Sequence, residues 1–342
     1  MRHCLYELSA DKLRQFFSKR GLDTKVEKNG CVFPVTDQAK DVKKVLLAEA
    51  ERLDVRFMYG RGVEDVEKGD GCFAVRTAKG VIFAEKVIIA TGGVTWPGTG
   101  SMGDGYRFSR KLGHTVIEPK AALVPLVTRQ SWPGQLAGIG LGNVRIAARV
   151  GGKKISVAGE MLFTHDGIGG PAVFNLSRLI TDYLPNEKEP IEISIDLMAE
   201  ISEAELEKKI LEQITSHPGK SIVNILAGFL QRRAATVLCA QFDFDGQCTA
   251  GRFRKEERKR LVRTIKHLPL SITATRPIDE ATVTRGGVNI EQIQSKTMES
   301  KICRGLFFAG EIIDVDGPCG GYNLQMCWST GALAGSAAAK NL

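Results

Sequence analysis

The spacing of apolar and polar residues in the first quarter of the chain predicts two helices, a hairpin and several short strands. Ser9 can cap a helix that runs to about Arg20, and Asn29-Gly30 is a turn that joins two short strands. Apolar residues at helical spacing predict a second helix over residues 39–53. The strands that follow are expected at Val55–Tyr59, Val63–Glu67, Phe73–Thr77, Val81–Ala84 and Val87–Ala90.

The run Val87–Ala90 is apolar at every position, which is typical of a strand covered on both faces in a parallel sheet. From about Pro125 to Ala281 the pattern changes to short alternating strands and then to a mainly helical stretch. Signals of an α/β fold return at Leu306–Gly310. The sequence therefore predicts an α/β domain interrupted by an inserted module with a β part and a helical part.

The chain has 342 residues, of which 43% are hydrophobic, and is long enough for two or three domains. Its apolar stretches are too short, or too rich in Ala and Gly, to cross a membrane, and the first residues lack a signal-peptide pattern, so we expect a cytoplasmic protein. The eight cysteines lack Cys-x-x-Cys or Cys/His spacing. We expect reduced thiols, with neither a disulfide framework nor a metal site.

The formal net charge of +8 favours anionic ligands, which include dinucleotides and nucleic acids. Much of the excess lies in residues 252–266, where Leu261, Val262 and Ile265 recur at helical spacing. We interpret the positive residues as the solvated face of an ordinary amphipathic helix and expect no nucleic-acid partner. The alternative is a surface for nucleic acid or for an acidic partner.

Two glycine-rich segments could border a ligand. Gly92 and Gly93 follow the buried strand, where a nucleotide could approach the backbone closely, although an ordinary turn has the same pattern. The segment Gly98–Gly103 satisfies G-x-G-x-x-G, but seven residues separate it from the strand, whereas a dinucleotide-binding fingerprint follows its strand directly. We expect a loop that flanks a ligand, with Asp104 capping the helix that follows.

His165 is the candidate catalytic residue. It stands beside Asp166, shortly before Pro171, a residue suited to the first turn of a helix. A histidine in this position can donate a proton near neutral pH, and it can equally be a turn residue that satisfies local backbone groups. Both interpretations stay open.

The segment from Gly305 to Gln325 carries the strongest functional pattern. Its glycines let the backbone run against a flat ligand, and Glu311 could accept a hydrogen bond from a sugar or ribityl hydroxyl. A helix that opens near Tyr322–Gln325 would direct its positive end at developing negative charge, as on a reduced flavin ring. A tight corner between a strand and a capped helix is the structural alternative.

Several motifs together resemble a family of NAD(P)/FAD-dependent oxidoreductases that includes aminoacetone oxidase-like and bile-acid dehydro-reductase-like flavoproteins. The resemblance covers essentially the whole chain. Its motifs, in chain order, are Ala90–Gly93, Thr99–Tyr106, Phe163–Pro171, Thr284–Val288, Thr297–Lys301 and Gly310–Gln325.

The resemblance implies an α/β protein with a glutathione-reductase-like FAD domain, interrupted by an insert with a small β-barrel and a helical part. The FAD domain would comprise residues 1–124 and 281–342, and the insert residues 125–280, with the barrel over about 125–198 and the helices over about 199–270.

By motif position the resemblance also implies the cofactor site. Val63 would pair with the adenine through its backbone, Glu311 would meet the ribityl-pyrophosphate region, and His165 would face the flavin from the insert. The implied FAD-binding residues are Val63, Thr91, Gly92, Gly93, Gly310, Glu311, Gly320, Gly321, Tyr322, Asn323, Leu324 and Gln325.

The chain departs from the family pattern at its start. Members begin with a βαβ unit that bears G-x-G-x-x-G, whereas Met1 here resembles an internal start, so we expect a truncated FAD domain with weak or absent FAD binding and an exposed sheet edge. The expected function is FAD-dependent transfer of hydride or electrons to or from a small organic substrate, impaired in this form, with NAD(P)H as a possible second cofactor. The alternatives are a non-catalytic fragment, or a nucleic-acid-binding protein that uses residues 252–266.

Overall fold

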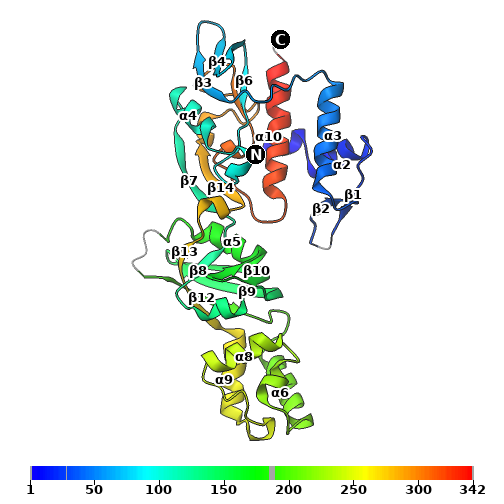
Figure 1. Cartoon of the computed structure of the whole chain (residues 1–342), viewed down its shortest axis with the longest axis vertical. Coiled ribbons are helices and arrows are strands. Elements are labelled where there is room, and N and C mark those ends of the chain that lie inside the picture. Colours follow the sequence, from blue (N-terminus) through cyan, green and yellow to red (C-terminus); the bar gives the residue numbers. More distant parts are fainter. Residues whose placement is uncertain (1, 28, 185–188, 341–342) are drawn as a thin grey trace. The chain divides into compact units, whose positions relative to one another are not determined.

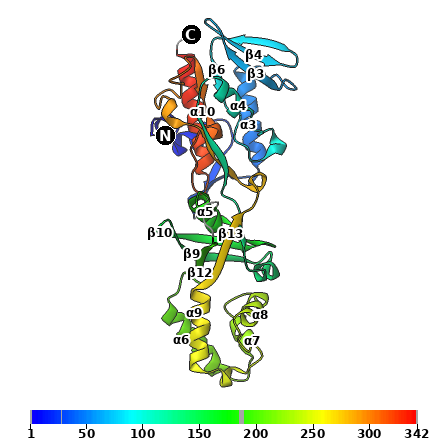
Figure 2. The same ribbon diagram turned by 90° about the vertical axis from the view of Figure 1, so that its left-hand side faces the viewer.

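The computed structural model describes residues 2–27, 29–184 and 189–340. They form two compact units, with unit 1 comprising Met1–Lys120 and Val283–Leu342 and unit 2 comprising Ala121–Thr282. Figure 1 shows the elements of each unit, and Figure 2 gives the view at a right angle. Among the described residues, no helix has the length and apolar character needed to cross a membrane.

Unit 1 is an α/β unit built from small sheets and several helices. Its helices are α1 (Arg2–Glu7), α2 (Ala10–Ser18), α3 (Ala39–Arg52), α4 (Asp104–Lys111) and α10 (Tyr322–Ala339), with short 3-10 turns at Pro97–Thr99, Ile290–Gln292 and Gly310–Ile312. Its strands are β1 (Thr24–Val26), β2 (Val32–Pro34), β3 (Val63–Lys68), β4 (Phe73–Thr77), β5 (Gly80–Ala84), β6 (Val87–Ile89), β7 (Val116–Ala122), β14 (Val283–Val288) and β15 (Leu306–Phe308). The pairings are β1 with β2, the meander β3-β4-β5, β6 with β15, and β7 with β14.

The N-terminal segment follows the sequence prediction closely. The Ser9 side chain accepts a hydrogen bond from the Lys12 backbone N–H, which confirms Ser9 as the cap of α2. The hairpin β1-β2 forms around the predicted turn. Phe17 is buried and meets Trp328 of α10 edge-on, with ring centroids 5.7 Å apart, so α2 is anchored to the C-terminal helix.

One prediction in this region is wrong. Residues 55–59 form an irregular segment with exposed Val55, Phe57 and Tyr59 side chains, because no described strand lies alongside to take up the backbone hydrogen bonds. The α3 helix forms as predicted, but its residues are all partly or fully exposed, and Leu53 at its end is 58% exposed. Within residues 55–59, the rings of Phe57 and Tyr59 stack on each other, with ring centroids 5.8 Å apart.

The parallel pair β6-β15 confirms the predicted parallel strand. Val87, Ile88 and Ile89 pair in register with Leu306, Phe307 and Phe308. The three β15 residues are buried, whereas Ile88 is 39% exposed, so the prediction that both faces of β6 are covered holds only in part. The core of unit 1 gathers around this pair and includes Phe73, Tyr106, Phe308, Ile312 and Leu333.

Unit 2 combines a closed six-stranded barrel with a group of helices. The barrel order is β10-β11-β8-β13-β12-β9, which provides the β part expected of the insert. Its strands are β8 (Leu126–Thr128), β9 (Gly140–Val150), β10 (Lys153–Phe163), β11 (Gly167–Gly169), β12 (Ile191–Asp196) and β13 (Leu268–Thr275). Its helices are α5 (Pro171–Ile180), α6 (Glu203–Ser216), α7 (Ile222–Leu226), α8 (Arg232–Gln241) and α9 (Lys255–Lys266), with 3-10 turns at Trp132–Leu136, Ala250–Arg252 and Ile278–Glu280.

The basic helix α9 is amphipathic, as predicted, but not all of its cations are solvated. Leu261, Val262 and Ile265 are buried, and so are Arg258 and Lys266. Lys266 Nζ lies 2.7 Å from Asp196 Oδ2, and Arg258 Nη2 lies 3.3 Å from Glu207 Oε1. These two charges attach α9 to β12 and α6, which leaves the exposed cations of the helix to face solvent.

Candidate functional site

The two strands of the parallel pair end at the same edge. The Ala309 N–H donates a hydrogen bond to the carbonyl of Ile89 at 3.1 Å, so the chain leaves β6 and β15 side by side. The residues that follow are Thr91, Gly92 and Gly93 after β6, and Gly310 and Glu311 after β15. The structure thus brings together five of the residues predicted to bind the cofactor, and we call this set the glycine edge. Ligands of α/β sheets typically bind outside such carboxyl ends.

Thr284 of β14 connects the two sides of the glycine edge. Its backbone N–H donates to Glu311 Oε1, and its Oγ1 accepts hydrogen bonds from the N–H groups of Val94 at 2.9 Å and Thr95 at 3.3 Å. A Cβ added to Gly93 would lie 2.1 Å from Thr284 Oγ1. Glycine at position 93 therefore allows the backbone to come into direct contact with Thr284.

Sequence reasoning assigned no role to Thr284, although it opens the segment Thr284–Val288 that carries part of the family resemblance. The signal that could have found it is a polar residue just before Gly286-Gly287. The chain is tightly enclosed there, since a Cβ on Gly286 would lie 2.5 Å from the carbonyl oxygen of Glu118.

Glu311 is a partly buried carboxyl at the glycine edge. Burial raises its pKa, and the opposing effect of hydrogen bonds from Thr284 is smaller. Burial also raises the pKa of the nearby Cys327 thiol to about 11, with a further contribution from the Glu311 charge. The Glu311 carboxyl can therefore accept a hydrogen bond from a ligand hydroxyl when ionised, and can donate one when protonated.

Two buried hydroxyls near this edge have no hydrogen-bond partner among the described residues. They belong to Thr95, which is 1% exposed, and Tyr106, which is 3% exposed. The charge of Glu311 acts on Tyr106 and, after burial, helps to raise its pKa. Buried hydroxyls are normally hydrogen-bonded, so the surroundings of Glu311 suit a ligand that brings polar atoms.

The α10 helix presents its N-terminus beyond Gly321, whose φ of +86° is in the left-handed region. No described side chain caps this helix, so its first N–H groups and its positive dipole end are available to an anionic or electron-rich group. The Gly310 N–H donates to Thr330 Oγ1 of α10 at 2.9 Å, which fixes the helix to the glycine edge.

The side chains of Asn323 and Gln325 are engaged within the protein. Asn323 Oδ1 accepts from the Gly317 N–H at 2.7 Å, and its Nδ2 donates to the Gly317 carbonyl at 3.0 Å. Gln325 Nε2 donates to the carbonyl of Leu8 at 2.9 Å. These two predicted site residues therefore hold the loop before α10 and the N-terminal segment, whereas Tyr322 and Leu324 are 61% and 65% exposed.

The remaining predicted residues lie elsewhere. Val63 begins β3 and pairs with Thr77 of β4, within the meander. His165 is exposed in the turn between β10 and β11 of unit 2, and its neighbour Asp166 forms an ion pair with Arg276 at 2.6 Å. The roles of Val63 and His165 stay predictions.

The loop after β6 corrects the predicted cap of the next helix. Gly103, with φ of +81°, is the N-cap of α4, and Asp104 is its first residue without a capping hydrogen bond. Asp104 instead lies 3.6 Å from Arg107 as an ion pair. The left-handed conformation at Gly103 turns the chain into the helix without a capping side chain.

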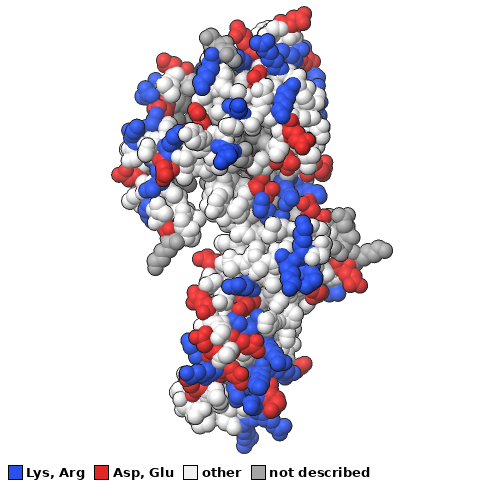
Figure 3. Space-filling model, turned by 180° about the vertical axis from the view of Figure 1, so that it is seen from behind, with Lys and Arg blue, Asp and Glu red and all other residues white. Residues whose placement is uncertain are grey.

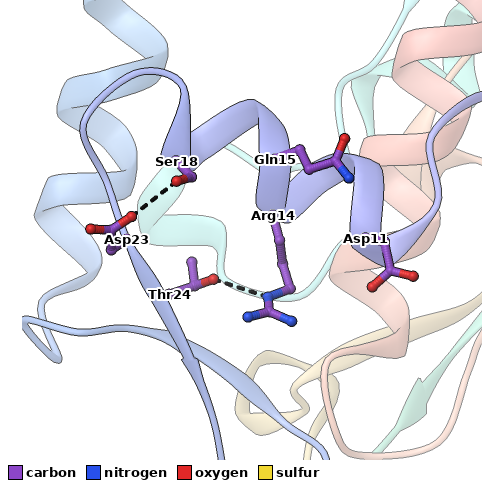
Figure 4. Close-up of a pocket in the computed structure, with 6 residues that line it drawn as sticks. All are labelled: Asp11, Arg14, Gln15, Ser18, Asp23 and Thr24. Atoms are coloured by element: carbon purple, nitrogen blue, oxygen red, sulfur yellow. Dashed lines mark hydrogen bonds between the residues drawn. The ribbon is translucent and has the colours of Figure 1, made fainter.

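A separate cavity of about 390 Å³ lies between α2 and β1 (Figure 4). Arg14 Nε donates to Thr24 Oγ1 at 3.1 Å, and Ser18 Oγ donates to Asp23 Oδ1 at 3.0 Å. The cavity is lined by Asp11, Arg14, Gln15, Ser18, Asp23 and Thr24, a set that contains none of the predicted site residues.

Comparison with known proteins gives one family and several relatives. The family model described as HI0933-like protein Rossmann domain matches residues 1–337. The chain is 32% identical over 340 residues to the 3-dehydro-bile acid delta(4,6)-reductase of Clostridium scindens, an alignment that covers 99% of this chain and 82% of that protein. It is 31% identical over 295 residues to the ribosomal RNA dihydrouridine synthase of Escherichia coli, covering 86% of this chain and 70% of that protein. It is 33% identical over 298 residues to the synthase of the same name from Haemophilus influenzae, covering 85% and 71%.

Proposed function

The chain belongs to the HI0933-like family and is an oxidoreductase with a Rossmann-like fold, and from this premise we propose that it uses FAD to reduce a carbon–carbon double bond in a small organic molecule. The names of the relatives support the reaction class. A delta(4,6)-reductase and a dihydrouridine synthase both add hydrogen across a carbon–carbon double bond. NAD(P)H is the proposed source of electrons.

The observation that carries the proposal is the glycine edge held together by Thr284. Glycine at positions 93 and 310 lets the backbone of the two loops pack against Thr284 and Cys327, and in this proposal the Glu311 carboxyl accepts a hydrogen bond from a ribityl hydroxyl. The unpartnered Thr95 hydroxyl beside Thr284 is a further polar group for such a ligand. These residues fit an FAD, which when bound supplies two-electron hydride transfer.

The protein's own part in this site is to position groups. Thr284 fixes the separation of the two loops, and Asn323 holds the loop that precedes α10 through its two bonds to Gly317. The α10 N-terminus stabilises negative charge that develops near Gly321. His165 is proposed as a proton donor, a role that the exposure of its side chain permits.

Activity with a defined substrate class tests this proposal. The purified chain is supplied with FAD and NADPH or NADH, and a set of ketones with a conjugated double bond is assayed for saturated product. We expect turnover of at least one member, and loss of it on the change Glu311→Ala. If neither nucleotide supports turnover by a protein whose circular dichroism spectrum is that of the folded chain, reduction of this substrate class is excluded.

A second candidate substrate is uridine in structured RNA. Two relatives are ribosomal RNA dihydrouridine synthases, and Lys255, Lys259 and Arg263 are exposed on α9. In Figure 3 the helical end of unit 2 carries Lys and Arg side chains interspersed with acidic ones. Salt-dependent retention of the protein on immobilised RNA, lost when these three charges are reversed, would support RNA as substrate. Absence of retention at low salt would exclude RNA as substrate. Arg258 is left unchanged because it is buried against Glu207.

A further inference from the structure

Two cysteines from opposite ends of the sequence come together in unit 1. Cys31 follows the turn of the β1-β2 hairpin, and Cys319 lies in the loop that leads to α10. A Cβ added to Gly320 would lie 3.9 Å from Cys31 Sγ, so the Cys31 thiol lies against the residue next to Cys319. Both cysteines are half-buried, which leaves each of them reachable by a small reagent.

Cys31 also acts on the Cys319 thiol electrostatically. Burial raises the pKa of the Cys319 thiol, and the charge of Cys31 raises it further. A raised pKa lowers the thiolate fraction of Cys319.

We propose that Cys31 and Cys319 are a reversible modification site that forms a disulfide by exchange with a low-molecular-mass disulfide such as glutathione disulfide. The Cys31 thiolate attacks one sulfur of glutathione disulfide and releases one glutathione. The Cys319 thiolate then attacks the Cys31 sulfur of the mixed disulfide and releases the second glutathione. Two protein thiols are oxidised to one disulfide, and one glutathione disulfide is reduced to two glutathione thiols.

The bond would lie beside a region where the N-terminal segment already contacts α10. Ser329 Oγ and Gln325 Nε2 of α10 donate to the Leu8 carbonyl at 2.7 and 2.9 Å, so the N-terminal segment rests on the first turns of α10. A disulfide between Cys31 and Cys319 would tie the hairpin to the loop before Gly321. Closing so long a loop restricts the unfolded chain, so the oxidised protein is the more stable form.

Other cysteines of unit 1 are less suited to this exchange. Cys4 is 1% exposed and directs its thiol at Met298 Sδ at 3.4 Å. Burial raises the pKa of Cys327 to about 11, which suppresses its thiolate. Cys72 is half-buried like Cys31 and lies in the β3-β4 turn, which makes it a matched control.

The test is a thiol map of the full chain in glutathione buffers of rising oxidised fraction. Remaining thiols are alkylated, and the tryptic peptides are analysed by mass spectrometry. We expect a peptide pair joined through Cys31, with a loss of about 2 Da that marks one disulfide. Cys319 and Cys327 share one tryptic peptide, so the link must disappear in Cys319→Ser and Cys31→Ser and persist in Cys327→Ser and Cys72→Ser.

Alkylation of both Cys31 and Cys319 at the oxidising end would overturn the proposal. So would separate glutathione adducts on the two residues without a link between them, and so would a link that survives Cys319→Ser. The map needs neither flavin nor substrate, so its outcome is independent of the proposed reductase function.

Discussion

The backbone N–H of Thr284 donates a hydrogen bond to the carboxylate of Glu311. Thr284 lies in β14 and Glu311 lies in the turn after β15, 27 positions later. The Thr284 hydroxyl at the same time receives the N–H groups of Val94 and Thr95. One residue thus sets the relative position of the two loops that leave β6 and β15.

Replacing Gly93 by alanine should destabilise unit 1. The new Cβ would lie 2.1 Å from Thr284 Oγ1, so the loop must move or the Thr284 side chain must leave its hydrogen bonds. A loss of about 1–3 kcal/mol in the free energy of unfolding is the usual cost of such crowding. Urea unfolding measures it, with Gly98→Ala as the control because a Cβ there meets open space. Equal midpoints for the two variants would contradict close contact at Gly93.

Glu311 should make stability depend on pH. Its pKa in the folded protein is raised above the usual 4.5, so its contribution to stability is fully present below about pH 4.5 and is lost as pH rises through the raised value. Glu311→Gln keeps the shape but cannot ionise. We expect the variant to gain stability relative to the parent as pH increases above 4.5, measured by urea unfolding at several pH values. A difference that is constant with pH would show that the carboxyl is not buried.

His114 should also make stability depend on pH, with the loss of stability on the acid side. Its ring is buried, its Nε2 lies 2.8 Å from Ser300 Oγ, and burial lowers its pKa below the usual 6.5. The stability contributed by the neutral ring is present above pH 6.5 and is lost as pH falls through the lowered value. His114→Gln should therefore flatten the acid side of the stability curve between pH 6.5 and the folded pKa. An unchanged acid slope would mean that the proton is accommodated in the folded state.

Lys266 should contribute far more to the stability of unit 2 than the exposed cations of α9 do. Its Nζ lies 2.7 Å from Asp196 Oδ2 and also donates to the Met198 carbonyl at 3.0 Å. Lys266→Met removes one partner of a buried pair, which typically costs about 3–5 kcal/mol. Lys259→Met on the exposed face of the same helix should change the unfolding free energy by less than about 0.5 kcal/mol. Similar losses for both variants would contradict the buried pair.

Sequence reasoning succeeded where local pattern decides the structure. The cap at Ser9, the turn at Asn29-Gly30 and the helix that begins at Tyr322 all depend on neighbouring residues. It failed at residues 55–59, because an apolar run forms a strand only when another strand lies beside it. The apolar stripe of residues 39–53 predicts the α3 helix, but whether that stripe is buried depends on elements distant in the sequence.

Local sequence pattern likewise predicts part of the candidate site and misses the part that depends on long-range contacts. The glycines after β6 and β15 could be found because they break two apolar runs, and the register of the parallel pair then places them together. Thr284 could not be found in this way, since its role rests on contacts with residues about 190 positions earlier. The engagement of Asn323 by Gly317 is likewise a property of the folded loop.

Binding of FAD to the glycine edge is tested most directly by titrating the purified chain into FAD and following the flavin fluorescence. Thr284→Val removes the hydroxyl that receives the N–H groups of Val94 and Thr95, and Thr284→Ser retains it. The sequence led us to expect weak or absent FAD binding, whereas the glycine edge leads us to predict saturable quenching with the parent and the serine variant. With the valine variant we predict binding weaker by about tenfold, or ~1.4 kcal/mol. No saturable change with the parent protein, or equal affinity of the valine variant, would contradict a flavin site at this edge.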